Sequence, residues 1–171
     1  MQQAGRRFGG SGPFKLTRLA LTAAAVAAAA VTMISSATAS PKQTATGTIA
    51  VTARTLVLSY RSGNDVVREL EVHRTLTGTF VGAEVSLVHN VTRSDGSQDL
   101  TVTSSCNCTV EGRTGTVTFS ERGTIDLNGI ITVRRKIIDA TGGLEGLRGN
   151  LYVSDLIAAP AQNYTGRYKL D

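Results

Sequence analysis

The sequence contains no tryptophan, and its 171 residues include only 4 phenylalanines and 4 tyrosines. A protein core made from this chain is therefore lined mainly by Val, Ile, Leu and Thr. Inside a small β-barrel such side chains leave room for a cavity, although they do not by themselves require one. Functional motifs are lacking too, because no Ser-His-Asp order, phosphate-binding loop or run of metal ligands stands out. The sequence therefore predicts no cofactor and no metal site, and it indicates no particular reaction.

Acidic residues are absent from the first 39 residues, which carry four basic ones instead. These are Arg6, Arg7, Lys15 and Arg18. An alanine-rich apolar run at 19–34 and the small residues of 37–39 follow, in the order typical of a secretory signal peptide. The apolar run is shorter than the roughly 18 residues expected of a membrane-spanning helix. We therefore predict a signal peptide at 1–39 and export of the domain 40–171, which would begin at Ser40.

The basic charge of the chain is concentrated in this leader. Removing its 4 basic residues from the 18 Lys and Arg leaves 14, against 13 acidic residues. The remaining 132 residues, 171 minus 39, suit one nearly neutral domain. Without a basic patch, we predict no nucleic-acid partner, and no membrane association once the leader is removed. The pair Arg6-Arg7 is a feature of twin-arginine signals, but the residues after it depart from the usual order, which favours the general secretory route.

Helical periodicity is absent after residue 44, where Thr, Val, Ile and Leu alternate with polar residues up to residue 168. We expect eight strands, at 46–60, 66–76, 79–92, 99–110, 115–126, 130–139, 150–157 and 163–170. Turn-forming pairs such as Glu111-Gly112 and Asn128-Gly129 separate them and predict sequential hairpins. The fold class is therefore all-β. A single antiparallel up-and-down β-barrel leaves no open sheet edge, whereas a β-sandwich is the alternative that the same pattern allows.

Four glycines interrupt the strand pattern within residues 140–149, Ala-Thr-Gly-Gly-Leu-Glu-Gly-Leu-Arg-Gly. This stretch resembles the A-T-G-x-L-x-G-L-R-G signature of small bacterial β-barrels related to allene oxide cyclase and the dirigent proteins, a family mostly of unknown function. Residues 165–168, Thr-Gly-Arg-Tyr, resemble its closing strand, so that the resemblance extends over 45–171. It implies an eight-stranded barrel that cradles a hydrophobic molecule and needs no cofactor. It further implies a homo-oligomer, and as an alternative activity a cofactor-free cyclase or isomerase.

Within the signature we expect structural roles rather than catalytic ones. Gly142, Gly146 and Gly149 suit positions where φ is positive or where another backbone segment comes close. Arg148 is expected to hold the turn in place, either by hydrogen bonds to backbone carbonyls or by pairing with a carboxylate such as Glu145 or Asp139. Substitutions at these positions should therefore reduce stability before they affect any activity.

Cys106 and Cys108 share the apolar parity of their predicted strand and should point into the core. Two cysteines in an exported protein suggest a disulfide. However, residues two apart in an extended strand have Cα atoms about 6.6 Å apart, near the upper limit for bridging. A disulfide would therefore need a bulge or a tight turn. Two buried thiols, or a redox or metal role, are the alternatives.

Three ionisable residues fall on strand faces that are otherwise apolar: His89, Glu121 and Arg135. The apolar residues expected to line the interior beside them are Val85, Leu87, Val117, Phe119 and Val133. One interpretation is an internal network whose charges satisfy one another, or an error in the assigned register. The other is a pocket in which His89 acts as acid or base, Glu121 is its partner, and Arg135 clamps an anion or a carbonyl.

These features lead to one prediction with two alternatives. We predict an exported barrel that binds a small, largely apolar molecule in its interior. The cyclase or isomerase implied by the resemblance is the first alternative. The second is a structural or interaction protein whose barrel is filled by its own side chains. The volume that the inward-facing residues leave free separates these classes.

Overall fold

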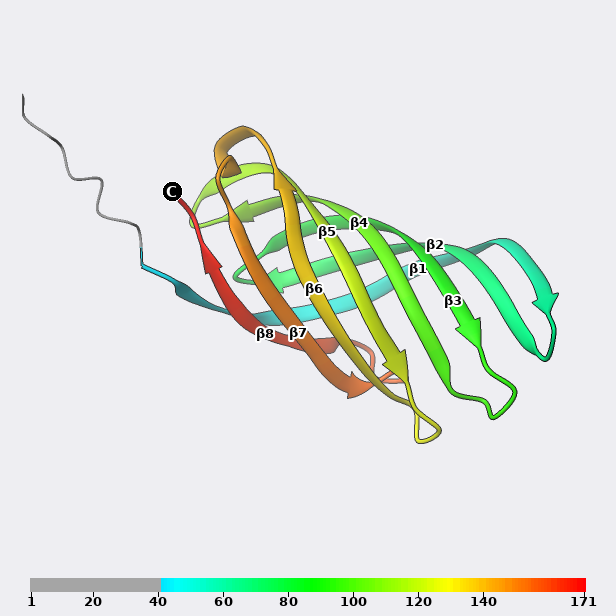
Figure 1. Cartoon of the computed structure of the whole chain (residues 1–171). Coiled ribbons are helices and arrows are strands. Elements are labelled where there is room, and N and C mark those ends of the chain that lie inside the picture. Colours follow the sequence, from blue (N-terminus) through cyan, green and yellow to red (C-terminus); the bar gives the residue numbers. More distant parts are fainter. Residues whose placement is uncertain (1–40) are drawn as a thin grey trace, which may run out of the picture. The chain divides into compact units, whose positions relative to one another are not determined.

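The computed structural model describes residues 41–171, which form a closed barrel of eight antiparallel strands in sequential order (Figure 1). The strands are β1 (Gln43–Ser62), β2 (Asp65–Gly78), β3 (Val81–Thr92), β4 (Gln98–Val110), β5 (Arg113–Ile125), β6 (Ile130–Ala140), β7 (Arg148–Leu156) and β8 (Gln162–Lys169). All eight predicted strands are present with ends within three residues of expectation, and the closed ring rules out the sandwich. A single turn of 3-10 helix, η1 (Gly142–Leu144), joins β6 to β7.

The described residues contain no helix that is long and apolar enough to cross a membrane. The predicted signal peptide lies outside the described residues. The domain predicted to begin at Ser40 is therefore described from residue 41 onward.

The barrel has two unlike ends. The β1–β2, β3–β4, β5–β6 and β7–β8 connections gather at one end, which we call the open end, and η1 and the C-terminus lie at the other, the closed end (Figure 1). β1 pairs with β8 only from Gln43 to Ile49 but continues along β2 as far as Ser62. Register shifts between Val51 and Ala53, and again further on, bend this strand. The β1–β2 hairpin therefore extends past β8 and leaves a mouth at the open end.

The closed end is filled by aromatic side chains. Phe80, in the β2–β3 turn, makes edge contacts with the rings of Phe119, Tyr164 and Tyr168 at centroid distances of 5.9, 6.3 and 5.9 Å. The Phe80 amide donates a hydrogen bond to the Tyr164 hydroxyl, which in turn donates to the Thr77 carbonyl oxygen. These four rings are the only aromatic side chains buried in the described residues, so none remains to fill the open end.

A disulfide between Cys106 and Cys108 lies in the same filled half, with both residues buried. The two cysteines point inward, as their parity predicts. Their Cα atoms are 5.3 Å apart, which is less than in a fully extended strand. The pairing of β4 with β3 and β5 continues without a register shift at this position, so the bulge or turn that we expected is not needed.

The glycine signature forms the turn around η1 at the closed end. Gly142 and Gly146 have φ values of 66° and 82°, a region that side chains with a Cβ rarely adopt. A Cβ atom on Gly149 would lie 2.5 Å from the Arg167 carbonyl oxygen, so that glycine permits close approach of β7 and β8. The prediction that Arg148 pairs with Glu145 or Asp139 is wrong. Its exposed side chain forms an ion pair with Asp171 instead. The reason is that the C-terminus returns beside this turn.

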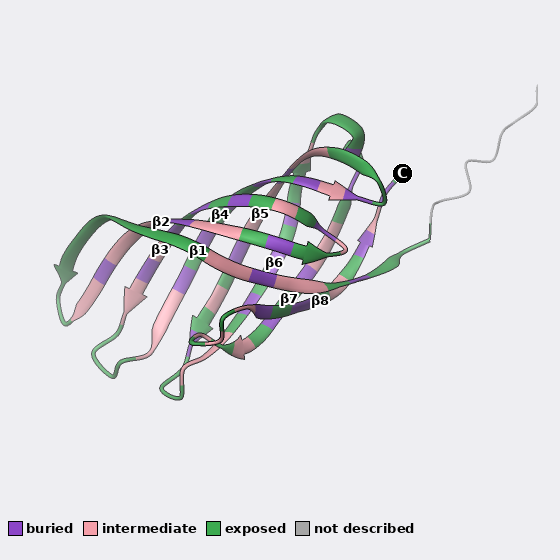
Figure 2. Cartoon of the chain, turned by 180° about the vertical axis from the view of Figure 1, so that it is seen from behind, coloured by how far each residue is buried: buried purple, intermediate pink, exposed green. Residues whose placement is uncertain are grey.

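Alternation along the strands separates buried from exposed residues (Figure 2). Buried and exposed positions follow one another along β4, β6 and β7, as expected for a barrel with one inward and one solvated face. The inward face of the closed end is a packed core. The inward face of the open end surrounds the candidate site.

Candidate functional site

The open end of the barrel encloses a cavity of about 310 Å³, near the lower end of the range for small-molecule sites, which is roughly 300–1,000 Å³. Each strand from β2 to β7 contributes an aliphatic side chain to its wall. These are Val72, Val88, Leu100, Ile125, Val133 and Val153. All six are Val, Leu or Ile, whose small volume leaves the space open where aromatic rings fill the other end.

A layer of polar side chains, all of them buried except the partly exposed Arg74, forms the floor of this cavity. It consists of Arg74, Glu84, Ser104, Glu121 and Arg135, one from each of β2 to β6. Arg74 donates to Glu84 at 3.0 Å and lies 3.4 Å from Glu121. Ser104 donates to Glu121 at 2.7 Å. The layer separates the filled closed end from the cavity.

Arg135 is the central residue of the floor and is 0% exposed. Its Nη2 atom is 3.1 Å from Glu121 and also contacts Glu84 and Ser104. Its guanidinium carbon lies 4.3 Å from the centroid of Phe119, which places the cation over that ring on the filled side. The Nε and Nη1 atoms are buried and have no hydrogen-bond partner among the described residues. Arg135 also lines the cavity.

The floor carries two positive and two negative charges. Burial alone would raise the pKa of Glu121, but Arg135, Arg74 and the Ser104 hydroxyl together lower it below its ordinary value. Burial alone would lower the pKa of Arg135, but the carboxylates of Glu121 and Glu84 outweigh this effect and raise the pKa above its ordinary value. Glu121 and Arg135 are therefore both charged at neutral pH and balance one another. A carboxylate held in this way is a weak base.

We expect Glu121 to make the protein acid-sensitive. Because its pKa is lower in the folded state than the ordinary value of 4.5, its contribution to stability is present above that value. The contribution is lost as the pH falls through the folded-state pKa. The stability difference between wild type and Glu121→Gln should therefore shrink on acidification. Thermal unfolding of both proteins from neutral to acidic pH measures this, and a difference that stayed constant or grew would contradict it.

The mouth of the cavity is polar and basic. Asn90 donates to Gln98 at 2.7 Å, and Arg68 donates to Thr92 at 3.1 Å. Arg54 and Arg68 both line the cavity, and neither takes part in an ion pair within residues 41–171. A ligand would therefore pass a cationic, hydrogen-bonding rim before it reaches the apolar wall.

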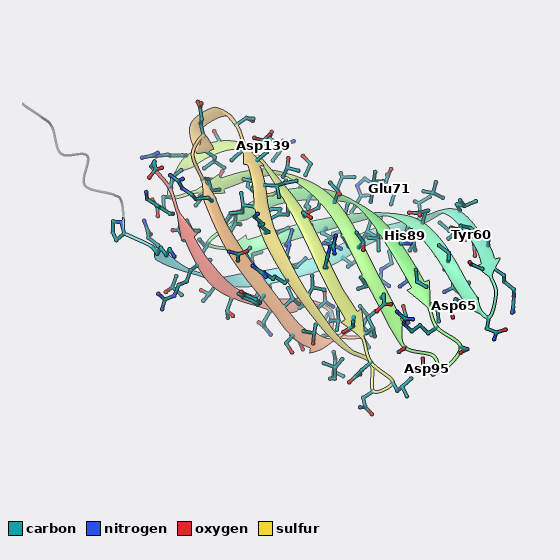
Figure 3. All side chains as sticks on the ribbon, in the orientation of Figure 1. Tyr60, Asp65, Glu71, His89, Asp95 and Asp139 are labelled. Atoms are coloured by element: carbon teal, nitrogen blue, oxygen red, sulfur yellow. A yellow bond between two sulfur atoms is a disulfide. The ribbon has the colours of Figure 1, made fainter. Side chains whose placement is uncertain are left out.

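The structure corrects the predicted inward face of β3. His89 lies on the outer side of the barrel (labelled in Figure 3), 2.5 Å from Glu69, and it does not meet Glu121 or Arg135. Val85 and Leu87 are 43% and 61% exposed on the same face. The inward residues of this strand include Glu84, which belongs to the polar floor, and Ser86, which donates a hydrogen bond to Glu84. The more apolar face of β3 is therefore the outer one. The role of His89 as a pocket acid or base is therefore withdrawn.

The other predicted site residues lie inside the barrel, at two levels. Glu121 and Arg135 meet in the floor, and Val133 lies in the cavity wall. Val117 and Phe119 are buried among the core residues and do not line the cavity.

Sequence reasoning missed Arg74, Glu84 and Ser104, which complete the floor. Arg74 shares its parity on β2 with Leu70, Val72 and Leu76, which is the same signal that singled out Arg135. Glu84 carried no such signal, because its strand face also holds a serine and an asparagine.

The fold has counterparts among known proteins. Residues 45–165 match a family model described as "Protein of unknown function (DUF3224)". A solved structure of a DUF3224 protein of unknown function from Shewanella oneidensis is similar, with a TM-score of 0.65 and 16% identity over 77% of this chain and 99% of that chain. The pterocarpan synthase dirigent protein PsPTS1 is also similar, with a TM-score of 0.51 and 11% identity over 76% of this chain and 94% of that chain. At these identities the likeness is one of fold. No curated protein matches this sequence.

Proposed function

The chain belongs to the DUF3224 family of proteins of unknown function, and we propose that it is an exported β-barrel protein that binds a small, largely apolar molecule in its open end. One observation carries this proposal: half of the barrel is packed with aromatic rings, whereas the other half encloses a cavity of about 310 Å³ with an aliphatic wall. A barrel that served only as a scaffold would gain stability by filling this space. Export rests on the leader sequence and remains a prediction.

The charge state of the floor favours binding over acid–base catalysis. Glu121 is held ionised by two arginines, and His89 lies outside the cavity. General acid–base catalysis works best with a group whose pKa lies near the working pH, and Glu121 does not meet this condition. Glu121 is therefore poorly suited to proton transfer at neutral pH.

A cofactor-free cyclase or isomerase is the second candidate. It is supported by the position of Arg135 in the lining of a largely apolar cavity, because a guanidinium group can polarise a carbonyl group. The similar dirigent structure is named a pterocarpan synthase, which supports this second candidate. In this candidate the barrel would hold a reactive molecule in the shape that closes the ring. Recovery of the bound molecule unchanged favours the binding protein, whereas conversion favours the cyclase.

The test places the same substitution on the two faces of one strand. Val88 lines the cavity, whereas Val85, three residues earlier on β3, is exposed on the outer surface. We expect N-phenylnaphthylamine, a neutral fluorescent probe, to bind the wild-type barrel with one-to-one stoichiometry. Val88→Phe should weaken this binding by about tenfold or more, since one added ring takes up much of the cavity. Val85→Phe should bind the probe as wild type does.

Fluorescence titration of the three proteins provides the measurement, and circular dichroism checks that each keeps its β structure. Equal probe binding by Val88→Phe and wild type would show that the probe sits elsewhere. The proposal would then lose its support, because the cavity would not be the apolar binding site.

A further inference from the structure

The outer surface of the barrel carries a basic groove that is separate from the cavity. It lies over β1, β6, β7 and β8 and has a volume of about 760 Å³. Within residues 41–171 no acidic side chain lines it, whereas five basic ones do: Lys42, Lys136, Arg148, Arg167 and Lys169. These residues are scattered along the sequence, which therefore shows no basic patch. Only the pairing of the strands brings them together.

Strand register places two of these cations on one row across the groove. Lys136 on β6 is paired with Asn150 on β7, which is paired with Arg167 on β8. Neighbouring strands lie about 4.8 Å apart, so the backbones at Lys136 and Arg167 are roughly 10 Å apart. Arg134 joins the same row, because its guanidinium donates a hydrogen bond to the Asn150 side-chain oxygen at 3.3 Å.

Most of this positive charge has no counterion in the protein. Arg148 and Lys169 share the carboxylate of Asp171. Arg134 is paired across the strands with Arg122 on β5, and like charges directly opposite each other are destabilising. An anionic partner would relieve this repulsion. Four cations of this surface take part in no ion pair within residues 41–171: Lys42, Arg134, Lys136 and Arg167.

Between the cations the groove offers hydroxyl groups and one aromatic ring. Thr44, Thr46 and Thr165 line it and are exposed. Tyr152, which is 51% exposed, is paired with Thr165 on one side and with Arg134 on the other. Threonine hydroxyls both donate and accept hydrogen bonds, and a tyrosine ring presents an apolar face beside a polar edge. The lining therefore suits a partner that combines negative charge with hydroxyl groups and C–H surfaces.

These features favour a sugar chain over other polyanions. Single-stranded nucleic acids are held by several aromatic side chains on which successive bases stack, whereas this groove has one exposed ring. Membrane surfaces are bound by apolar side chains that enter the lipid, and Tyr152 is the only large hydrophobic residue of the groove that is exposed. Carboxylate groups on the sugar match the planar fork of an arginine such as Arg167.

We propose that this groove binds an acidic polysaccharide, a chain of uronic acids whose carboxylates lie against Lys136 and Arg167 and whose sugar rings lie on Tyr152. The groove is on the outside of the barrel, so this second binding surface does not depend on the molecule that occupies the cavity. It gives the barrel a place to attach to a polymer while its open end remains accessible.

The probe for this surface is hexagalacturonate, titrated into the purified protein by calorimetry. We expect one-to-one binding that weakens as salt is added. Arg167→Gln should weaken binding about fivefold or more, and Tyr152→Ala, which leaves the charge unchanged, about threefold or more. The matched control is Arg61→Gln, which removes an exposed arginine of the β1–β2 hairpin that takes part in no ion pair within the described residues. This control should bind as wild type does.

Two further probes test the chemical class of the partner. Maltohexaose, a neutral sugar chain of the same length, should not bind, and hexathymidylate should bind more weakly than hexagalacturonate. Tighter binding of hexathymidylate, or sedimentation with phosphatidylglycerol vesicles that Arg167→Gln abolishes, would assign the groove to nucleic acid or to a membrane and overturn the sugar class.

The site itself is overturned by either of two results. One is the absence of hexagalacturonate binding, and the other is an equal loss in Arg167→Gln and Arg61→Gln. Unchanged binding in Tyr152→Ala, together with equal affinity for the two anions, would show a non-specific charged surface and would contradict the proposal as well. Circular dichroism of each variant checks that the β structure is retained.

Discussion

Replacing Glu84 alone by glutamine is expected to lower the free energy of unfolding by about 3–5 kcal/mol, the usual cost of breaking a buried ion pair from one side. Glu84 is 1% exposed and contacts both Arg74 and Arg135. Without its charge, the guanidinium groups of the buried Arg135 and the partly exposed Arg74 face the single carboxylate of Glu121. Urea denaturation of wild type and variant measures the difference.

The matched control is the double variant Glu84→Gln with Arg135→Met, compared with each single variant. Because it removes one negative and one positive charge together, it should cost clearly less than the sum of the two single substitutions. Strictly additive costs would mean that the floor residues act independently. In that case the balanced charge of the floor would not be what holds Arg135 in place.

Phe80→Ala is expected to cost about 3–5 kcal/mol, the range for removing a buried aromatic side chain. Phe80 is 0% exposed, and its ring contacts the three other buried aromatic rings. Its removal would leave a void among side chains held by a closed sheet, which cannot collapse to fill it. The melting temperature and the urea midpoint should both fall.

Tyr152→Ala provides the control, because it removes an aromatic ring that is 51% exposed on the outer face of β7. We expect its effect to stay within about 0.5 kcal/mol of wild type, as for most surface substitutions. Equal costs at positions 80 and 152 would contradict the distinction between a packed closed end and a hollow open end. The cavity would then need another explanation than the distribution of aromatic residues.

The strands and their order were predictable because they depend on local pattern. Side chains alternate between two faces with a period of two only in an extended chain, so polar–apolar alternation indicates strands. Pairs such as Asn128-Gly129 indicate the hairpin turns, which need a positive φ, here 76° at Gly129. The inward direction of Glu121 and Arg135 followed from the same alternation, because Phe119 on β5 and both Val133 and Ile137 on β6 lie two residues away and are apolar and buried.

The inward face of β3 was not predictable from that rule. Alternation tells which residues share a face, but the choice between faces assumed that the apolar one points inward. In β3 the inward face carries Glu84, because this strand crosses the barrel at the level of the floor. The pairing of Glu84 with Arg135 joins residues 51 positions apart and depends on the register of three strand pairs. No local pattern contains that information.

The sequence by itself determined that this chain forms eight antiparallel strands and that its core is poor in aromatic rings, since period, turn residues and composition are local or additive properties. Only the tertiary structure decided that all four buried rings gather at the closed end, that five polar side chains form a floor beneath a cavity, and that Arg135 keeps two donors unpaired beside it. The physical reason is that closure of the sheet sets the register of every strand at once. That register places residues from β2 to β8 at a common height, and height along the barrel, rather than sequence position, determines which side chains meet.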